Sequence, residues 1–140
     1  MMEQKFIIYP EIDHDSALYW QSLREHKAKL QKCSKCGRLR FPPSASCYYC
    51  GMLGGEWTTI SGKGTIYTWI VVHHPVDPRL VKEVPFVIAL VELEEGPRVA
   101  GRLLGCDHKE IDVDMHVKAQ YDDIDNELTL LNFKSTTGTT

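Results

Sequence analysis

The chain has 140 residues, 43% hydrophobic and 25% charged, and this near-average balance excludes a wholly disordered protein. Its formal net charge of −3 argues against a general nucleic-acid binder, because such proteins gain affinity from a surplus of cations. No apolar run reaches the roughly 20 residues that span a bilayer, and the first residues lack the pattern of a signal peptide. We therefore expect a cytoplasmic protein without a membrane partner.

Residues 13–32 have the pattern of an amphipathic helix. Asp15 or Ser16 is suited to accept bonds from the unpaired N–H groups at its start, and no Pro or Gly interrupts the segment. Four side chains recur on one helical face, namely Tyr19, Leu23, His26 and Leu30. The region is also basic, since residues 24–40 contain seven Lys or Arg against one Glu. We expect residues 1–32 to form an N-terminal helical arm.

Two Cys-x2-Cys pairs follow the arm, and each is followed by glycine. Cys33 and Cys36 form the first pair, and Cys47 and Cys50 form the second, with ten residues between them. Cysteines three positions apart can present both sulfurs to one ion, and glycine allows the positive φ that closes the turn. Four thiolates complete the tetrahedral shell of Zn²⁺ and leave no open position for a substrate. The spacing predicts a structural zinc ribbon over residues 33–56.

The same cysteines have alternative interpretations. Iron in a rubredoxin-like centre takes the same four thiolates, so zinc is favoured but iron stays open. A thioredoxin-like redox pair needs a βαβ setting that the sequence lacks, and free buried cysteines leave two matched pairs unexplained. The segment contains too few apolar residues to fold by burial alone. Metal binding is therefore expected to contribute directly to its folding.

From Trp57 onward the pattern changes to β-strands. Five segments rich in β-branched and aromatic residues are expected to be strands, namely 65–72, 85–93, 98–104, 115–121 and 128–133. A Gly-Pro turn joins the second and third, and residues 108–112 supply one helical turn. Five strands with a long first loop, 73–84, match an OB-fold barrel, although an SH3-like barrel is also compatible. We expect this domain over 57–134, before a disordered tail, 135–140.

The expected fold is therefore mainly β, with an N-terminal helical arm, a rubredoxin-like zinc ribbon and a C-terminal five-stranded OB-fold barrel. Outside the four paired cysteines, few residues offer catalytic chemistry. Cys106 stands alone, and its proximity in sequence to His108 does not supply the lowered pKa that a reactive thiol needs. His73 and His74 are adjacent, so they point to opposite faces of a strand and make a poor metal pair. We expect a protein that is not an enzyme.

The order of the motifs resembles the DUF35 family. The chain carries CSKCG from Cys33, FPP at 41–43, CYYCG from Cys47, SGKGTIY at 61–67 and VELEEG at 91–96, and the resemblance covers about residues 15–133. It departs before the fourth strand, where Asp-Val-Asp-Met replaces a glycine-containing turn. The resemblance implies a non-catalytic scaffold subunit that binds a thiolase or HMG-CoA synthase-like enzyme and helps hold its CoA thioester.

A site for acyl-CoA requires cations for its phosphates and an aromatic or apolar slot for its adenine. The arm and the ribbon contain these residue types close together, and the candidates are Tyr19, Trp20, Arg24, Lys27, Lys29, Arg38, Arg40 and Phe41. The alternative for any one of them is a solvated basic face, with Tyr19 and Trp20 in the core.

Two other functions remain open from the sequence. A single-stranded nucleic-acid binder would use Tyr67, Trp69 and Phe86 as stacking platforms, unless strand alternation turns these rings into the barrel. A hydrolase of CoA thioesters would place Cys106 or His108 in its site.

Overall fold

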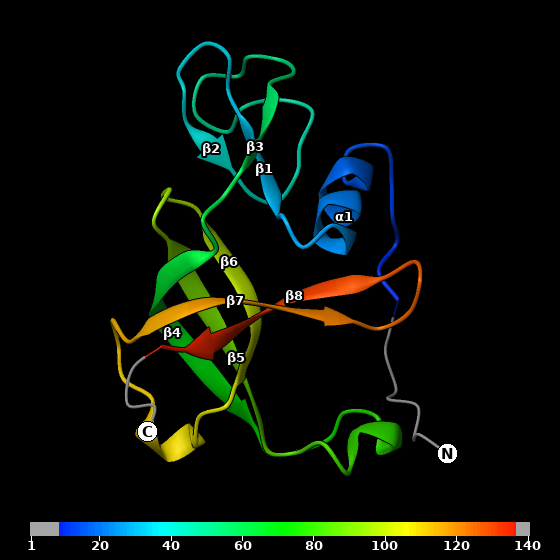
Figure 1. Ribbon diagram of the computed structural model, residues 1–140, viewed down its shortest axis with the longest axis vertical. Helices are drawn as coiled ribbons and strands as arrows, with labels where there is room; N and C mark the ends of the chain where they lie inside the picture. Colours follow the sequence, from blue (N-terminus) through cyan, green and yellow to red (C-terminus); the bar gives the residue numbers. More distant parts are fainter. Residues whose placement is uncertain (1–8, 137–140) are drawn as a thin grey trace.

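The computed structural model describes residues 9–136, which form a small sheet and a closed barrel with one helix beside them (Figure 1). The first part contains α1 (Ala17–Arg24), β1 (Lys29–Lys32), β2 (Leu39–Arg40) and β3 (Glu56–Thr59). The barrel contains β4 (Lys63–Val72), β5 (Phe86–Leu93), β6 (Arg98–Leu104), β7 (His116–Asp123) and β8 (Thr129–Ser135), with single 3₁₀ turns η1 (Pro78–Leu80) and η2 (His108–Glu110). Within the described part of the chain, no helix has the length and apolar character needed to cross a membrane.

The helix is shorter than the sequence predicts. A continuous helix over 13–32 is wrong, because α1 ends at Arg24 and residues 29–32 form β1. His26 ends the helix in a left-handed conformation, with φ of 57°, and its N–H donates to the Leu23 carbonyl at 2.9 Å. At the other end, Ser16 occupies the capping position without a side-chain bond to the helix, and it exchanges two hydrogen bonds with Asp13 instead.

The segment after α1 is the central strand of the ribbon's sheet. β1 pairs antiparallel with β2 on one side and with β3 on the other. Gln31 lies opposite Arg40 in one pair and opposite Trp57 in the other. The sheet is therefore assembled from segments on both sides of the cysteine pairs, and part of the expected arm belongs to the ribbon.

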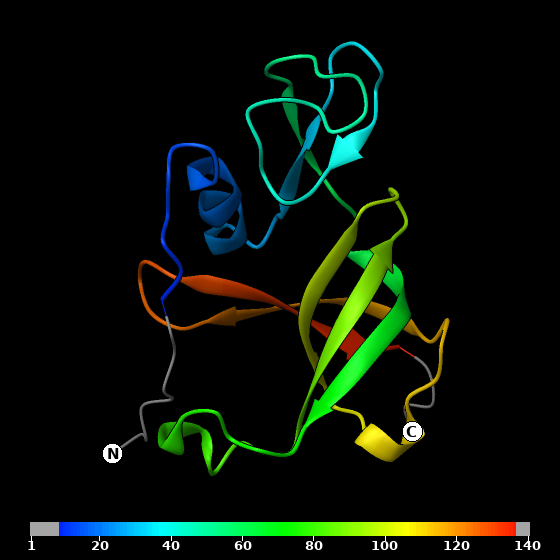
Figure 2. The same cartoon turned by 180° about the vertical axis from the view of Figure 1, so that it is seen from behind.

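The barrel closes in the order β4-β5-β6-β8-β7, with β7 returning to β4. β6 and β8 pair in parallel, and the other neighbours are antiparallel. Figure 2 shows β4, β5 and β6 from behind as one curved layer, with β7 and β8 crossing on the other side. This is the five-stranded OB-fold arrangement predicted from the sequence. All five expected strands occur, the helical turn lies at η2, and the hairpin turn lies between β5 and β6.

The barrel core is formed by inward side chains from every strand. Ile66, Val91 and Phe133 are fully buried there. Gly64 allows β4 to close against β5, because a Cβ at this position would lie 2.5 Å from the carbonyl oxygen of Glu92. β8 continues to Ser135, which is buried, so the strand takes in the first residue of the expected tail. Residues 137–140 of that tail, and residues 1–8 of the expected arm, lie outside the described residues.

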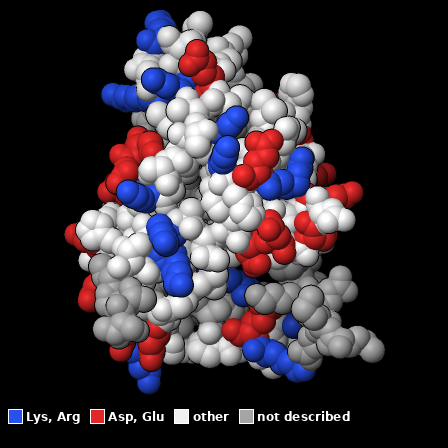
Figure 3. All heavy atoms as spheres, viewed as in Figure 1, with Lys and Arg blue, Asp and Glu red and all other residues white. Residues whose placement is uncertain are grey.

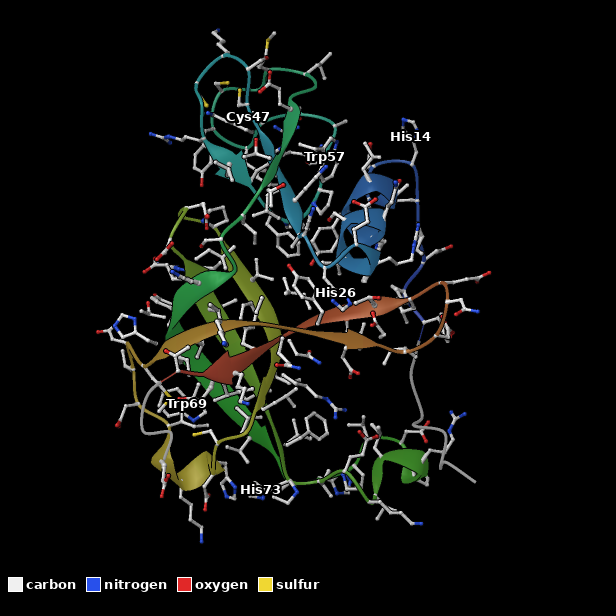
Figure 4. All side chains as sticks on the ribbon, viewed as in Figure 1. His14, His26, Cys47, Trp57, Trp69 and His73 are labelled. Carbon is white, nitrogen blue, oxygen red and sulfur yellow. The ribbon has the colours of Figure 1, made fainter. Side chains whose placement is uncertain are left out.

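The end of α1 is attached to the barrel through His26 (Figure 4). The His26 ring stacks on Tyr121, with 4.9 Å between ring centroids, and its Nε2 lies 2.9 Å from a carboxylate oxygen of Asp123. The pKa of Asp123 is lowered, first by the hydroxyl of Thr129, which donates to it at 2.6 Å, and then by His26. The Ala28 N–H donates to the Tyr121 hydroxyl at 2.9 Å. These contacts fix the start of the ribbon relative to β7.

Candidate metal centre and neighbouring residues

The four paired cysteines meet at one point of the ribbon. Their sulfur atoms all lie within 4.8 Å of one another, with 3.5 Å between Cys33 and Cys50 and 3.7 Å between Cys36 and Cys47. A tetrahedral ion with Zn–S bonds of about 2.3 Å requires sulfurs about 3.8 Å apart. Figure 4 shows Cys47 in the loops above the small sheet, away from the barrel. The thiols are therefore positioned to bind one four-coordinate metal ion.

The two cysteine pairs have the same backbone geometry. The carbonyl of Cys33 accepts a hydrogen bond from the Gly37 N–H at 3.0 Å, and the carbonyl of Cys47 accepts one from Gly51 at the same distance. Both glycines have positive φ, 76° and 78°, a conformation that side-chain-bearing residues rarely adopt. The repeated Cys-x2-Cys-Gly pattern is thus explained by two matching turns that aim their sulfurs at a shared centre.

Backbone N–H groups favour the thiolate form at this centre. The N–H of Cys36 and then that of Lys35 donate to the Cys33 sulfur at 3.4 Å, and they lower the pKa of Cys33 to about 6. The pKa of Cys47 is lowered in the same way, by the N–H groups of Cys50 and Tyr49. At Cys50, the backbone N–H of Met52 lowers the pKa, but burial and the neighbouring sulfurs outweigh it and raise the pKa to about 11. The thiolate is the form that ligates metal, so the backbone N–H groups prepare Cys33 and Cys47 for that role.

Arg40, a candidate for CoA binding, is a structural residue of the ribbon instead. Its side chain is 2% exposed, and its Nη2 donates to the carbonyls of Ser44 at 2.9 Å and Gly54 at 2.8 Å. Its Nε and Nη1 are buried without a hydrogen-bond partner in the described part of the chain. Arg40 joins the segments before and after the second cysteine pair, and it is not placed to reach a ligand.

Tyr19 also lies in the core, as the alternative interpretation of the sequence anticipates. Its ring is 6% exposed and packs edge-on against Trp20 and at a tilt against Phe41, with 5.3 Å between centroids in each case. Burial raises its pKa. Trp20 and Phe41 are half-buried. The three rings join α1 to the ribbon, and only Trp20 and Phe41 keep open surface.

The remaining candidate cations are spread along the chain from the end of α1 to the ribbon. Arg24 and Lys27 are exposed at the end of α1, and Lys29 is half-buried at the start of β1. Arg24 donates to the carbonyl of Glu127 at 3.3 Å. Arg38 lies on the ribbon, where its guanidinium sits 4.6 Å from the centre of the Tyr49 ring. Arg24 therefore belongs to α1, Lys27 to the link after it and Lys29 to β1, while Arg38 lies just before β2.

Cys106 lacks the features of an activated thiol. Burial, Glu110 and Asp107 all raise its pKa, and its sulfur donates weakly to the Asp107 carbonyl at 3.5 Å. His108 packs edge-on against His73, with 5.6 Å between centroids, in the loops at the far end of the barrel. A protonated thiol is a weak nucleophile, so this group does not have the chemistry of a thioesterase site.

The ribbon exposes apolar side chains that the sequence did not identify as functional. Tyr48 is 53% exposed, Tyr49 59%, Met52 43% and Leu53 72%. We call these four residues the ribbon patch. The sequence does contain an indication of this patch, because four large apolar residues fall within six positions of a segment that is too small to bury them.

Comparison with known proteins identifies both parts of the chain. Residues 20–52 match the model of the ChsH2 rubredoxin-like zinc ribbon domain, and residues 57–122 match that of the ChsH2 C-terminal OB-fold domain. The chain is 35% identical to a DUF35 domain-containing scaffold protein of Methanocaldococcus jannaschii, over 73% of each chain. It is 37% identical to the 3-oxo-4,17-pregnadiene-20-carboxyl-CoA hydratase alpha subunit of Mycobacterium tuberculosis, over 81% of this chain and 36% of that one.

A solved structure described as Ltp2-ChsH2(DUF35) aldolase superposes with a TM-score of 0.83 at 35% identity, covering 92% of this chain and all of its counterpart. The chain spans well under half the length of the curated hydratase subunits that it matches. The matched ribbon, the matched OB-fold and the cysteine geometry agree along most of its length. The chain belongs to the DUF35 family, whose members join a rubredoxin-like zinc ribbon to an OB-fold domain.

Proposed function

We propose that the chain is a non-catalytic accessory subunit that binds a thiolase or HMG-CoA synthase-like enzyme and helps hold its CoA thioester. Cys33, Cys36, Cys47 and Cys50 bind one structural Zn²⁺, which makes the ribbon rigid. The exposed ribbon patch is the observation that carries the proposal. The names of the relatives support it, since they include scaffold proteins, a CoA hydratase subunit and an aldolase assembly.

The ribbon patch has the chemistry of a docking surface. Its four large apolar side chains flank Cys50 in the sequence and are exposed, as are Lys35 and Arg38. The guanidinium of Arg38 lies 4.6 Å from the centre of the Tyr49 ring. Contiguous exposed apolar side chains with a polar rim commonly mark protein interaction sites. A rigid ribbon also loses little conformational entropy when it binds. The patch fits an enzyme that offers an apolar socket with acidic residues at its edge.

Leu53→Asp is expected to break the complex with the partner enzyme. Leu53 is the most exposed member of the ribbon patch, so the substitution leaves the free chain folded but places a charge in the apolar contact. A pull-down from the native source identifies the partner enzyme. Titration of the purified enzyme should then show that Leu53→Asp binds it at least about tenfold more weakly than the unaltered chain does.

Val76→Asp is the matched control for this substitution. Val76 is 85% exposed in the loop after β4, outside the ribbon. It is expected to leave the affinity unchanged. Equal binding by Leu53→Asp and the unaltered chain would contradict docking through the ribbon patch, and recovery of no enzyme of acyl-CoA metabolism would contradict the proposed function.

The CoA phosphates are assigned to Arg24 and Lys27, at the end of α1 and in the link after it, and the adenine to the open edges of Trp20 and Phe41. Lys27→Gln in the complex is expected to raise the Kd for CoA by roughly three- to tenfold, with a smaller effect on dephospho-CoA, because a charge-assisted phosphate contact is lost. Lys109→Gln, an exposed lysine of η2, is the control. Isothermal titration measures both variants. Equal losses for CoA and dephospho-CoA would place Lys27 at the diphosphate, and an unchanged affinity for both ligands would remove Lys27 from the site.

The alternative of a nucleic-acid binder receives less support from the OB-fold surface. The guanidinium of Arg98 covers the ring of Tyr67 at 3.7 Å, and that of Arg102 covers Phe86 at 4.1 Å. Trp69 is half-buried and packs against the barrel core. The three candidate stacking platforms are thus engaged by the protein itself, which agrees with the acidic net charge.

A further inference from the structure

Three lysines form a row across adjacent strands on the outside of the barrel. Lys63 of β4 lies directly opposite Lys118 of β7, and Lys118 lies directly opposite Lys134 of β8. Paired positions on neighbouring strands point to the same face of a sheet, and all three side chains are exposed. Figure 3 shows blue atoms gathered over this part of the barrel, where β4, β7 and β8 meet. We call these residues the lysine row.

The lysine row is electrostatically unfavourable in the free protein. Like charges directly opposite one another destabilise a sheet. Within residues 9–136, no carboxylate forms an ion pair with any of the three side chains. The nearby carboxylates are engaged elsewhere, since Glu92 contacts Arg98 at 3.5 Å and Glu94 accepts from the Ser61 hydroxyl at 2.9 Å. The residues next to these lysines along each strand, Gly64, Val117 and Phe133, are buried and pack in the barrel. The barrel core therefore does not depend on three cations at its surface.

A hollow of about 570 Å³ adjoins the row. Lys63 and Thr65 of β4 and His116 and Lys118 of β7 line one side, with Thr136 just after β8, and the carboxylates Glu92 and Glu94 line the side of β5 and the turn after it. Its volume lies within the range of small-molecule sites. Cations on one side and two carboxylates on the other suit a ligand with an anionic end and an uncharged body that carries hydroxyl or amino donors.

We propose that the lysine row and its hollow form a binding site for a small organic diphosphate. Lys63 and Lys118 hold the diphosphate, whose negative charge removes their mutual repulsion, and Lys134 adds a third cation at the end of the row. The hydroxyls of Thr65 and Thr136 and the carboxylate of Glu92 face the uncharged body. The site lies on β4, β7 and β8, apart from Arg24, Lys27 and the ribbon, and it requires no enzyme partner.

Titration of the metal-loaded full chain with ADP at low salt tests this site. Lys118→Gln removes the central cation and is expected to weaken ADP binding at least about tenfold, because it loses a contact to a doubly charged group. Lys109→Gln is a charge-matched control outside the hollow and should stay within about twofold of the unaltered chain. Failure of ADP to bind at about 1 mM, or equal affinities for the two variants, would overturn the proposal.

Two further titrations distinguish the lysine row from Arg24 and Lys27 and test the part played by the hollow. Inorganic pyrophosphate is expected to bind more weakly than ADP, and equal affinity would overturn the role of the hollow. Loss of ADP binding in Lys27→Gln but not in Lys118→Gln would assign the phosphates to the region of Lys27 and likewise overturn the proposal. The proposed CoA function would survive either result, since its test uses CoA and the enzyme complex.

The thermal stability of the free protein separates a ligand-binding role of Lys118 from a structural one. Lys118→Gln is expected to raise the melting temperature by roughly 1–3 °C at low salt, because it relieves repulsion on both sides. The gain should vanish at high salt, where exposed charges are screened. A lower melting temperature would mean that Lys118 supports the fold, and it would contradict the lysine row as a ligand site.

Discussion

Removal of the metal is expected to unfold the ribbon while the barrel stays folded. Among residues 33–56, the fully buried apolar side chains are those of Cys33 and Cys47, so little hydrophobic burial remains without the ion. Structural zinc sites in small domains contribute on the order of 10–16 kcal/mol of apparent binding energy. Amide exchange in a strong chelator should therefore show rapid exchange at Cys33 and Cys47 and continued protection at Ile66 and Val91 of the barrel.

Two cysteine substitutions make this prediction specific. Cys36→Ser removes one of the four ligands and should abolish metal binding and ribbon protection together. Cys106→Ser, outside the cluster, should keep one ion per chain and the full exchange pattern. Elemental analysis of the purified protein decides between zinc and iron. Absence of both metals, together with a ribbon that stays protected in chelator, would refute the metal centre and with it the rigid docking surface.

The metal centre and the barrel strands were predictable because their signals are short-range. Two matched Cys-x2-Cys-Gly turns define a ligand set within eighteen residues, and β-branched runs with turn residues between them define strands. The end of α1 was not predictable in this way. It depends on the left-handed conformation of His26, and the strand that follows pairs with β2 and β3, which come later in the sequence. Leu30 fits a helical face and a strand equally well.

The basic residues of the chain also show that proximity in sequence is a poor guide to proximity in space. The cations of residues 24–40 attract attention as a run in the sequence, yet the structure separates Arg38 from α1 and buries Arg40. The lysine row has no counterpart in the sequence, because Lys63, Lys118 and Lys134 are far apart along the chain. Only the strand register of the closed barrel brings them side by side. A run of cations in the sequence therefore does not place their side chains together, and side chains that lie together need not form a run.

Arg40→Met is expected to destabilise the ribbon by about 2–4 kcal/mol, although the sequence makes Arg40 a candidate ligand residue. The substitution keeps much of the side-chain volume but removes the hydrogen bonds that the guanidinium donates to the carbonyls of Ser44 and Gly54. Hydrogen bonds to a charged group contribute about 1.5–3 kcal/mol each, and the cost of burying the guanidinium offsets part of this. It also removes a buried positive charge from a ribbon whose four thiolates leave a net negative charge on the metal centre. Denaturant unfolding and the rate of metal release to a chelator should both show the loss.

Arg40→Lys should recover only part of the stability, because a single ammonium group cannot reproduce the geometry of a guanidinium between two carbonyls. Arg38→Met is the matched control, since Arg38 is exposed and its contact with Tyr49 is a surface one, so a change within about 0.5 kcal/mol is expected. CoA affinity in the complex separates the two roles. If Arg40→Met kept its metal and its stability but lost CoA binding, the assignment suggested by the sequence would be correct and the structural role would be wrong.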